Sequence, residues 1–158
     1  MIREMTRADF EIFWPTFQAI IQAQETYPYP PSLTFEQAYQ LWCEQPQKTL
    51  VVEESGQILG SYMIQPDAMG PGDHICNCSY ICQSAEGARI ATLMCEHSME
   101  MARELGYIAM LFRSVVSTNE VAIQLWQTLG FRIVGTIPKG YRHGRLGLVD
   151  SYIMFKSL

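Results

Sequence analysis

Charged side chains are scarce in this sequence: Asp, Glu, Lys and Arg make up 17% of the 158 residues, against about 25% in a typical soluble domain. Hydrophobic residues make up 48%, which excludes a disordered or fibrous chain. No apolar run approaches the roughly 20 residues that a membrane-spanning helix needs, and the first ten residues contain no apolar segment of a secretory signal. The net charge of −5 argues against a general nucleic-acid binder, because phosphate contacts require a basic face.

The five cysteines are an odd number, which gives no disulfide framework and suits a reducing cytoplasm. The length corresponds to about one domain, and no linker, low-complexity tract or internal repeat divides the chain. We therefore expect a single domain over residues 1–158, located in the cytoplasm, without nucleic-acid or membrane partners.

Hydrophobic periodicity and turn residues predict an α/β order of elements. A strand at 1–5 precedes an amphipathic helix from Phe10, with a kink or break at Pro15. The proline-rich segment 26–31 is irregular, and a second helix extends from the capping box Thr34-x-x-Gln37 to the residue before Pro46. The remaining strands are expected at 49–53, 57–64, 74–82, 107–116, 131–137 and 148–155. A third helix is expected at 87–106, and a fourth at 121–129 after a capping box at Ser117-x-x-Glu120. This order predicts a sheet of mixed direction.

Three segments could carry chemistry. The first is 81–94, where a strand is followed by a turn with one glycine and then a helix. This arrangement brings backbone N–H groups and the positive helix end to one point, which suits a phosphate. An ordinary strand–helix turn is the alternative. The segment 119–131 also fits a capped helix that faces the core. Tyr27 and Tyr29, on a loop constrained by prolines, either line a pocket or pack as part of a connector.

The strand at 74–82 carries a histidine and three cysteines but does not predict a metal site. On an extended strand, positions 74 and 82 lie roughly 26 Å apart, whereas zinc ligands converge within about 2.3 Å of one ion. We expect Cys76, Cys78 and Cys82 to be small hydrophobic residues on one strand face. His97 is expected in the core or at an interface.

Together, these segments resemble the GNAT N-acetyltransferase superfamily. That family joins an acetyl-CoA signature, [Arg/Gln]-x-x-Gly-x-[Gly/Ala], to a later Asn-x-x-Ala-x-x-Leu-Tyr-x-x-x-Gly-Phe element. The second element is nearly complete here as Asn119, Ala122, Leu125, Gly130 and Phe131, and the first is partial at residues 86–91. The resemblance implies a mixed, mostly antiparallel α/β (α+β) sheet flanked by helices, with the fourth and fifth strands splayed apart.

The resemblance also implies a site for acetyl-CoA. Ile81 and Cys82 would pair with the pantetheine arm, and Asn119 and Trp126 would flank its distal end. The pyrophosphate would bind backbone amides at the start of a helix, those of Gly87, Ala88, Arg89, Ile90 and Ala91. The implied reaction is transfer of the acetyl group to a primary amine of a small-molecule or amino-acid-like acceptor, with Tyr27 and Tyr29 as acceptor-pocket residues. Members of the family often form dimers, so a homodimer is also an expectation.

Three positions depart from the family pattern. Glu86 replaces Arg or Gln, and a carboxylate repels a pyrophosphate unless it turns away. Arg89 replaces Gly, which blocks close backbone approach but could supply a charge-assisted contact. Trp126 replaces the Tyr that protonates the CoA thiolate, and because an indole does not release its proton near neutral pH, we expect Trp126 to be a packing wall. Water, Tyr141 or another tyrosine could be the acid, and Asn77, which is no base, at best orders a water.

The acceptor remains open at this point. The acidic balance favours a cationic or zwitterionic molecule, and the glycine-rich run 140–147, with Tyr141 and His143, is expected to form a mobile loop near it. Because of the three departures, a second hypothesis stands beside the enzyme: a CoA-binding or sensing module of the same fold that has lost efficient transfer. A third hypothesis, a purely structural role, is supported only by the composition.

Overall fold

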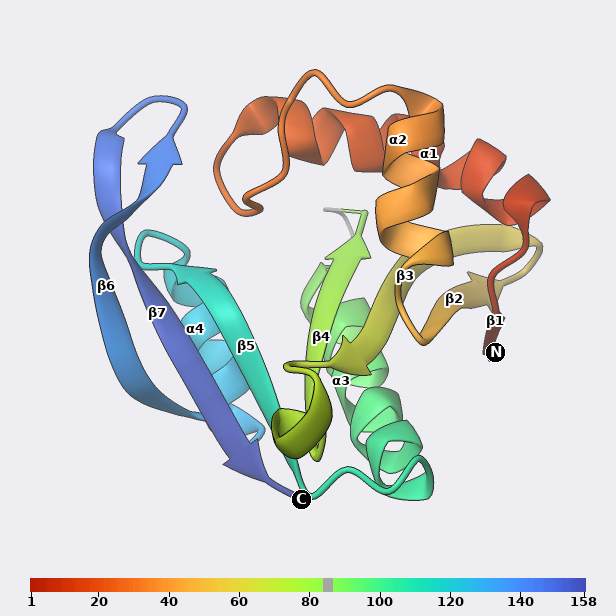
Figure 1. The fold of residues 1–158 in the computed structure, drawn as a ribbon. Coiled ribbons are helices and arrows are strands. Elements are labelled where there is room, and N and C mark those ends of the chain that lie inside the picture. The colour runs from red at the N-terminus through yellow and green to blue at the C-terminus, as the bar shows by residue number, and fades with distance from the viewer. Residues whose placement is uncertain (84–86) are drawn as a thin grey trace.

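Seven strands form one sheet in the order β1-β2-β3-β4-β5-β7-β6, in a computed structural model that describes residues 1–83 and 87–158 (Figure 1). The strands are β1 (Ile2–Glu4), β2 (Lys48–Glu54), β3 (Gln57–Pro66), β4 (Ile75–Cys82), β5 (Ala109–Val116), β6 (Arg132–His143) and β7 (Gly147–Ser157). The helices are α1 (Arg7–Ala23), α2 (Phe35–Tyr39) with the π-helix η1 (Gln40–Glu44), the short 3-10 helix η2 (Gly70–Gly72), α3 (Gly87–Glu104) and α4 (Glu120–Thr128). The mixed, mostly antiparallel sheet flanked by helices confirms the expected fold class.

The pair β4–β5 is the parallel one, and it is short. Its register runs from Ile75 opposite Ala109 to Asn77 opposite Leu111. Beyond that position the two strands diverge, which opens a fork in the middle of the sheet (Figure 1). The expected splay between the fourth and fifth strands is therefore present.

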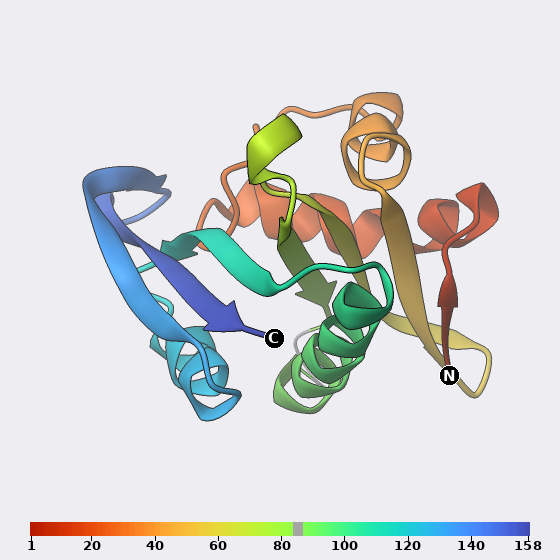
Figure 2. The ribbon, with the colours of Figure 1, turned by 60° about the horizontal axis from the view of Figure 1, so that its bottom comes forward.

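The two faces of the sheet carry separate hydrophobic cores. Helices α3 and α4 cover one face (Figure 2), where Cys76 and Cys78 are buried and Cys82 packs against their cluster. Helices α1 and α2 cover the other face with an aromatic cluster that includes Ile81. Gly60 of β3 allows α3 to approach, because a Cβ there would lie 2.8 Å from Cγ2 of Ile90.

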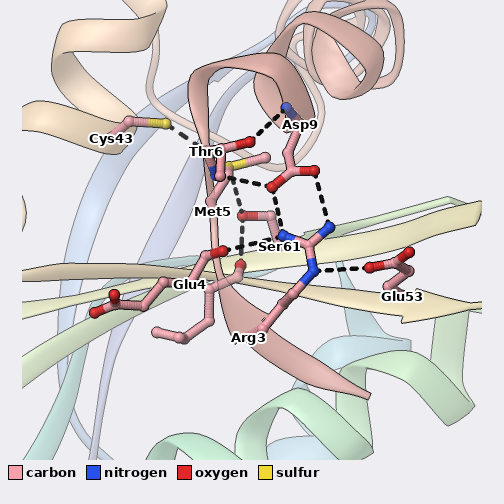
Figure 3. Close-up of polar contacts among 9 residues, drawn as sticks. Arg3, Glu4, Met5, Thr6, Asp9, Cys43, Glu53 and Ser61 are labelled. Carbon is pink, nitrogen blue, oxygen red and sulfur yellow. Dashed lines mark hydrogen bonds and ion pairs between the residues drawn. The ribbon is translucent and has the colours of Figure 1, made fainter.

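The start of α1 is fixed to the edge of the sheet (Figure 3). Thr6 and Asp9 form a reciprocal capping box, with Asp9 N to Thr6 Oγ1 at 3.1 Å and Thr6 N to Asp9 Oδ2 at 2.8 Å. Arg3 of β1 donates to both oxygens of Asp9, at 2.6 and 3.0 Å, and to Glu53 of β2 at 2.7 Å. The helix therefore begins at Arg7, earlier than the hydrophobic pattern from Phe10 indicated.

The expected break at Pro15 is wrong, because α1 continues through it. A proline inside a helix costs a backbone hydrogen bond, but Phe10, Phe13 and Phe17 on both sides of it are buried. Packing of both halves against the sheet offsets the local cost.

Two other expectations need correction. The cap of α4 is Asn119, whose side chain accepts from Ala122 N at 3.4 Å, rather than a box at Ser117. Strand β6 extends to His143 and pairs with β7 up to Gly147, so Tyr141 and His143 lie on a strand and are buried rather than in a mobile loop.

Candidate active site

A cleft of about 240 Å³ lies at the fork between β4 and β5. Its wall is formed by the connection after α1, by β3, β4 and β5, and by α4. The lining residues are Thr26, Tyr27, Pro28, Tyr29, Met63, Gln65, Asn77, Cys78, Ser79, Tyr80, Phe112, Arg113, Ser114, Val115, Val116, Asn119, Ala122 and Trp126. The structure thus brings Tyr27, Tyr29, Asn77, Asn119 and Trp126, all expected at the site, to one cleft.

The register of β3 and β4 determines which backbone groups of β4 face the fork. Asp67 N donates to Ile75 O at 2.8 Å and Gln83 N donates to Leu59 O at 3.1 Å, at the two ends of a continuous antiparallel ladder. Hydrogen-bonded pairs alternate along such a ladder, so the odd-numbered residues of β4 bond to β3. The backbone N–H groups of Tyr80 and Cys82, beyond the last β4–β5 pair, therefore point into the fork.

Ile81 takes a different place from the one expected. It pairs with Ser61 of β3 in that ladder, and its side chain is 1% exposed, in the core on the α1 face. Since its backbone groups are directed to β3, the residues of β4 that can pair with a ligand in the fork are Tyr80 and Cys82.

Trp126 forms a side wall of the cleft. Its ring is 5.2 Å from that of Tyr80 and 5.1 Å from that of Phe112, between centroids, and the residue is 8% exposed. This position agrees with the packing wall expected from the sequence. Asn119, the cap of α4, lines the cleft beside it.

The start of α3 presents backbone N–H groups that have no partner within a helix. Gly87 and Ala88 are at least partly exposed, whereas the side chain of Ile90 is buried and Ala91 packs against the core. Arg89 forms a two-pronged ion pair with Glu54 of β2, at 3.0 and 2.9 Å. This hydrogen bonding lowers the pKa of Glu54. Glu86 lies outside the described residues.

Tyr27 and Tyr29 form the opposite wall, with rings stacked at 6.3 Å and an interplanar angle of 12°. Burial raises the pKa of Tyr29 to about 12. Burial also raises the pKa of Tyr27 well above its usual value, although the nearby Tyr80 backbone acts in the opposite direction. Both hydroxyls therefore stay protonated at neutral pH.

Tyr141 does not line the cleft. Its hydroxyl donates to the backbone carbonyl of Tyr27 at 3.0 Å. Close by, Gly144 N donates to Gln24 O at 2.8 Å and Arg145 binds Glu25 at 3.1 Å. The tip of the β6–β7 hairpin therefore supports the loop that carries Tyr27.

Arg113, which was not expected at the site from the sequence, is the charged residue among those lining the cleft in the described chain. Its Nε and Nη2 atoms each lie 2.7 Å from a carboxylate oxygen of Asp67, just after β3. A charged residue inside the mostly apolar strand 107–116 was the available signal. No carboxylate or imidazole is among the described lining residues.

Away from the cleft, His97 Nδ1 lies 2.7 Å from the Tyr62 hydroxyl, and burial lowers the pKa of His97. Across residues 1–83 and 87–158, no group of three or more His, Cys, Asp or Glu side chains is arranged to hold a metal ion. In the same part of the chain, no helix combines the length and apolar character needed to cross a membrane.

Comparison with known proteins agrees with this architecture. The acetyltransferase (GNAT) family model matches residues 10–131. A GCN5-related N-acetyltransferase from Kribbella flavida is 38% identical, with a TM-score of 0.92, over 100% of this chain and 97% of its own. A ribosomal-protein-alanine N-acetyltransferase from Brucella melitensis is 23% identical, with a TM-score of 0.86, over 100% of this chain and 99% of its own.

A GNAT phosphinothricin acetyltransferase from Sinorhizobium meliloti, solved in complex with acetyl-CoA, is 16% identical with a TM-score of 0.85, over 100% of this chain and 88% of its own. The last two similarities concern the fold alone. The family model covers most of the chain, and the similarity to the Kribbella flavida structure extends over all of this chain. The chain belongs to the GNAT acetyltransferase family.

Proposed function

We propose that the protein is an acetyl-CoA-dependent N-acetyltransferase that acts on a primary amine of a small-molecule or amino-acid-like acceptor. The observation that carries the proposal is the fork, where β4 directs the N–H groups of Tyr80 and Cys82 into a cleft bounded by Asn119 and Trp126. Bound acetyl-CoA would supply the acetyl group as a thioester.

The chain's own groups fit such a ligand. Beyond the last β4–β5 pair, the edge of β4 at Tyr80 and Cys82 can pair with the amides of a pantetheine arm. The Tyr27 hydroxyl, which forms a hydrogen bond with the Tyr80 backbone, would have to give way.

The first turn of α3 offers backbone N–H groups and the positive end of the helix dipole to a pyrophosphate. At Gly87, a Cβ would have no atom of the described residues within 4 Å, which allows close approach. To reach a phosphate, Arg89 would have to leave or share its contact with Glu54.

In the reaction we propose, the neutral amine enters from the side of Tyr27 and Tyr29 and attacks the thioester carbonyl. The new nitrogen–carbon bond forms as the carbon–sulfur bond breaks, and the proton that the amine loses balances the one that the thiolate takes up. The Tyr80 N–H donates to the carbonyl oxygen as negative charge develops there. Water held by Asn77 and Ser79 accepts the amine proton, because the described lining residues include no carboxylate or imidazole.

The same shortage of titratable groups favours a second candidate, a CoA-binding or sensing module of the same fold. Trp126 cannot protonate a thiolate, and Tyr141 donates to the Tyr27 carbonyl instead of facing the cleft. In this alternative the protein binds acetyl-CoA without transferring the acetyl group efficiently. For either function, the five unpaired cysteines fit a reducing compartment such as the cytoplasm.

The test is a melting experiment followed by an assay of transfer. Acetyl-CoA at about 100 times its dissociation constant should stabilise the fold by about 2.7 kcal/mol, which corresponds to a rise in Tm of roughly 5–10 °C at this length. ATP, which lacks the pantetheine arm, is the control ligand. Release of CoA with a panel of primary amines, measured by chromatography so that the protein's cysteines do not interfere, supports the enzyme. Stabilisation without release supports the sensing module, and no stabilisation by acetyl-CoA contradicts both.

A further inference from the structure

We infer that the acceptor carries a carboxylate close to its amine and that Arg113 binds this carboxylate, so that the acceptor class is an amino acid or a related amino carboxylic acid. The inference rests on the proposed function, since it names the acceptor of that same cleft. It selects the zwitterionic acceptor over a purely cationic one.

The charge distribution of the cleft is the first argument. Arg113 is the charged member of the described lining set. A purely cationic acceptor would need a carboxylate in the wall, and the described lining residues contain none. The ion pair with Asp67 is neutral as a whole, but Asp67 is 10% exposed and does not line the cleft. The charged group that the described wall presents to a ligand is therefore the guanidinium, which attracts an anion.

The position of Arg113 is the second argument. On β5, Met110 and Phe112 belong to the core on the α3 face, so Arg113 lies on the opposite face by the alternation of a strand. That face also carries Gln65 and Asn77, and it is the face on which Tyr27 and Tyr29 lie. Arg113 thus belongs to the tyrosine side of the cleft, where the amine is proposed to enter.

The orientation of Arg113 is the third argument. Asp67 engages Nε and Nη2 at 2.7 Å each, and it is 10% exposed, whereas the Arg113 side chain is 60% exposed. The buried carboxylate therefore holds one edge of the guanidinium and leaves the other edge to solvent. In the part of the chain that the structure describes, Nη1 has no hydrogen-bond partner. A guanidinium held in this way offers directed N–H donors to a second carboxylate with little loss of conformational entropy.

The local shape of β5 supports the same role. The register with β7 shifts between Phe112 and Val115, which places Arg113 and Ser114 in an irregular segment of the strand. Such irregularities redirect side chains and are frequent beside active sites. The irregularity lies within the cleft wall, on the other side of the fork from Tyr80.

The first experiment measures binding to the protein saturated with CoA, by calorimetry. The probes are L-α-amino acids and their C-terminal amides, which keep the amine and side chain but lack the carboxylate. Wild type should bind the best acid at least about tenfold more tightly than its amide, and Arg113→Gln should lose about ten- to a hundredfold in affinity for the acid but not for the amide. Arg103→Gln, which removes an exposed arginine paired with Glu100 on α3, is the matched control and should bind like wild type.

Two results would overturn the inference: equal affinity of wild type for acids and amides, or an equal loss of both in Arg113→Gln. Asp67→Asn provides a second variant, since it keeps the shape but weakens the orientation of the guanidinium; affinity for the acid should fall less than in Arg113→Gln. If Asp67→Asn changes the affinities for acid and amide alike, the orienting role of Asp67 is wrong.

The second experiment repeats the panel with acetyl-CoA and measures released CoA. Preference for acids in binding without any release contradicts the proposed transferase, and with it the role of the amino acid as acceptor, but supports the binding of a carboxylate by Arg113. Acetylation of amides and acids with equal kcat/KM supports the transferase and overturns the inference. A kcat/KM ratio of acid to amide that collapses in Arg113→Gln supports both.

Discussion

The side-chain amide of Asn77 donates a hydrogen bond of 3.1 Å to the backbone carbonyl of Leu111, at the last paired position between β4 and β5. The two strands separate immediately beyond this contact, and the cleft begins there. Asn77 therefore joins the two halves of the sheet at the base of the fork. Its amide nitrogen has a structural partner, so a role in holding water falls to its oxygen.

Asn77→Asp should destabilise the fold and weaken acetyl-CoA binding. The substitution keeps the shape but replaces a donor by a carboxylate that faces a carbonyl oxygen, which costs about 1–3 kcal/mol and lowers Tm by roughly 3–8 °C. The carbonyl raises the pKa of the new carboxyl in the folded state, and the protonated acid can donate again. The difference from wild type should therefore shrink as the pH falls toward about 4, the pKa in the unfolded chain. Urea unfolding at several pH values measures this.

Gln65→Glu is the control for Asn77→Asp. It adds the same charge to the cleft at a residue whose side chain has no hydrogen bond within the described residues. If it destabilises the fold as much as Asn77→Asp does, the added charge and not the lost hydrogen bond is the cause.

Trp126→Tyr should restore the phenol that the family carries at this position. Both Trp126→Tyr and Trp126→Phe should lose about 1–3 kcal/mol of stability, because each leaves space beside Tyr80 and Phe112. If protonation of the thiolate limits turnover, the tyrosine variant should exceed the phenylalanine variant in kcat by about tenfold or more. Steady-state kinetics with one acceptor measures the ratio, and equal kcat values would show that a phenol here does not act as the acid.

Arg89→Gln and Glu54→Gln should change acetyl-CoA affinity in opposite directions. Arg89→Gln removes a potential phosphate contact and should weaken binding by about 5- to 20-fold, with a smaller dependence on salt. Glu54→Gln removes a carboxylate that competes for the guanidinium and should strengthen binding. Both residues are exposed, so the free energy of unfolding should change little. Tighter binding by Arg89→Gln would show instead that this side chain obstructs the phosphate site.

The local parts of this architecture could be predicted from the sequence. The element order follows from hydrophobic periodicity, and the buried cysteines of β4 follow from alternation along one strand. The resemblance to the GNAT family pointed to Asn119 and Trp126, and their relative position follows from the local geometry of one capped helix.

The parts that depend on pairing between distant segments could not be predicted. The role of Ile81 changed because the β3–β4 register, and not the sequence of β4, decides which backbone groups face the fork. The orientation of the Arg113 guanidinium depends on its ion pair with Asp67, which is 46 residues away in the chain. The continuous helix through Pro15 depends on tertiary packing that outweighs a local preference.

Stability in acid should depend on Asp9. The hydrogen bonds from Arg3 lower the pKa of Asp9 from 3.8 to about 2 in the folded state. As the pH falls, the unfolded chain therefore binds this proton before the folded chain does. Asp9 contributes about 1 kcal/mol to the free energy of unfolding after solvent screening. This contribution is present above pH 4 and is lost as the pH falls toward 2. Asp9→Asn should be less stable than wild type at pH 6, and the difference should narrow between pH 4 and pH 2. A constant difference over this range, measured by urea unfolding, would contradict the assignment.

Tyr141→Phe distinguishes support of the acceptor loop from acid catalysis. Loss of the hydrogen bond to the Tyr27 carbonyl should cost about 1 kcal/mol of stability and raise KM for the acceptor by about 3- to 10-fold, with kcat within about twofold. Were Tyr141 the acid, kcat would fall by about 100-fold or more, with KM unchanged. Tyr107→Phe is the matched control, because it loses one hydrogen bond, to Gln47, outside the cleft. It should show a comparable loss of stability without any change in KM, since the loop that carries Tyr27 keeps its support.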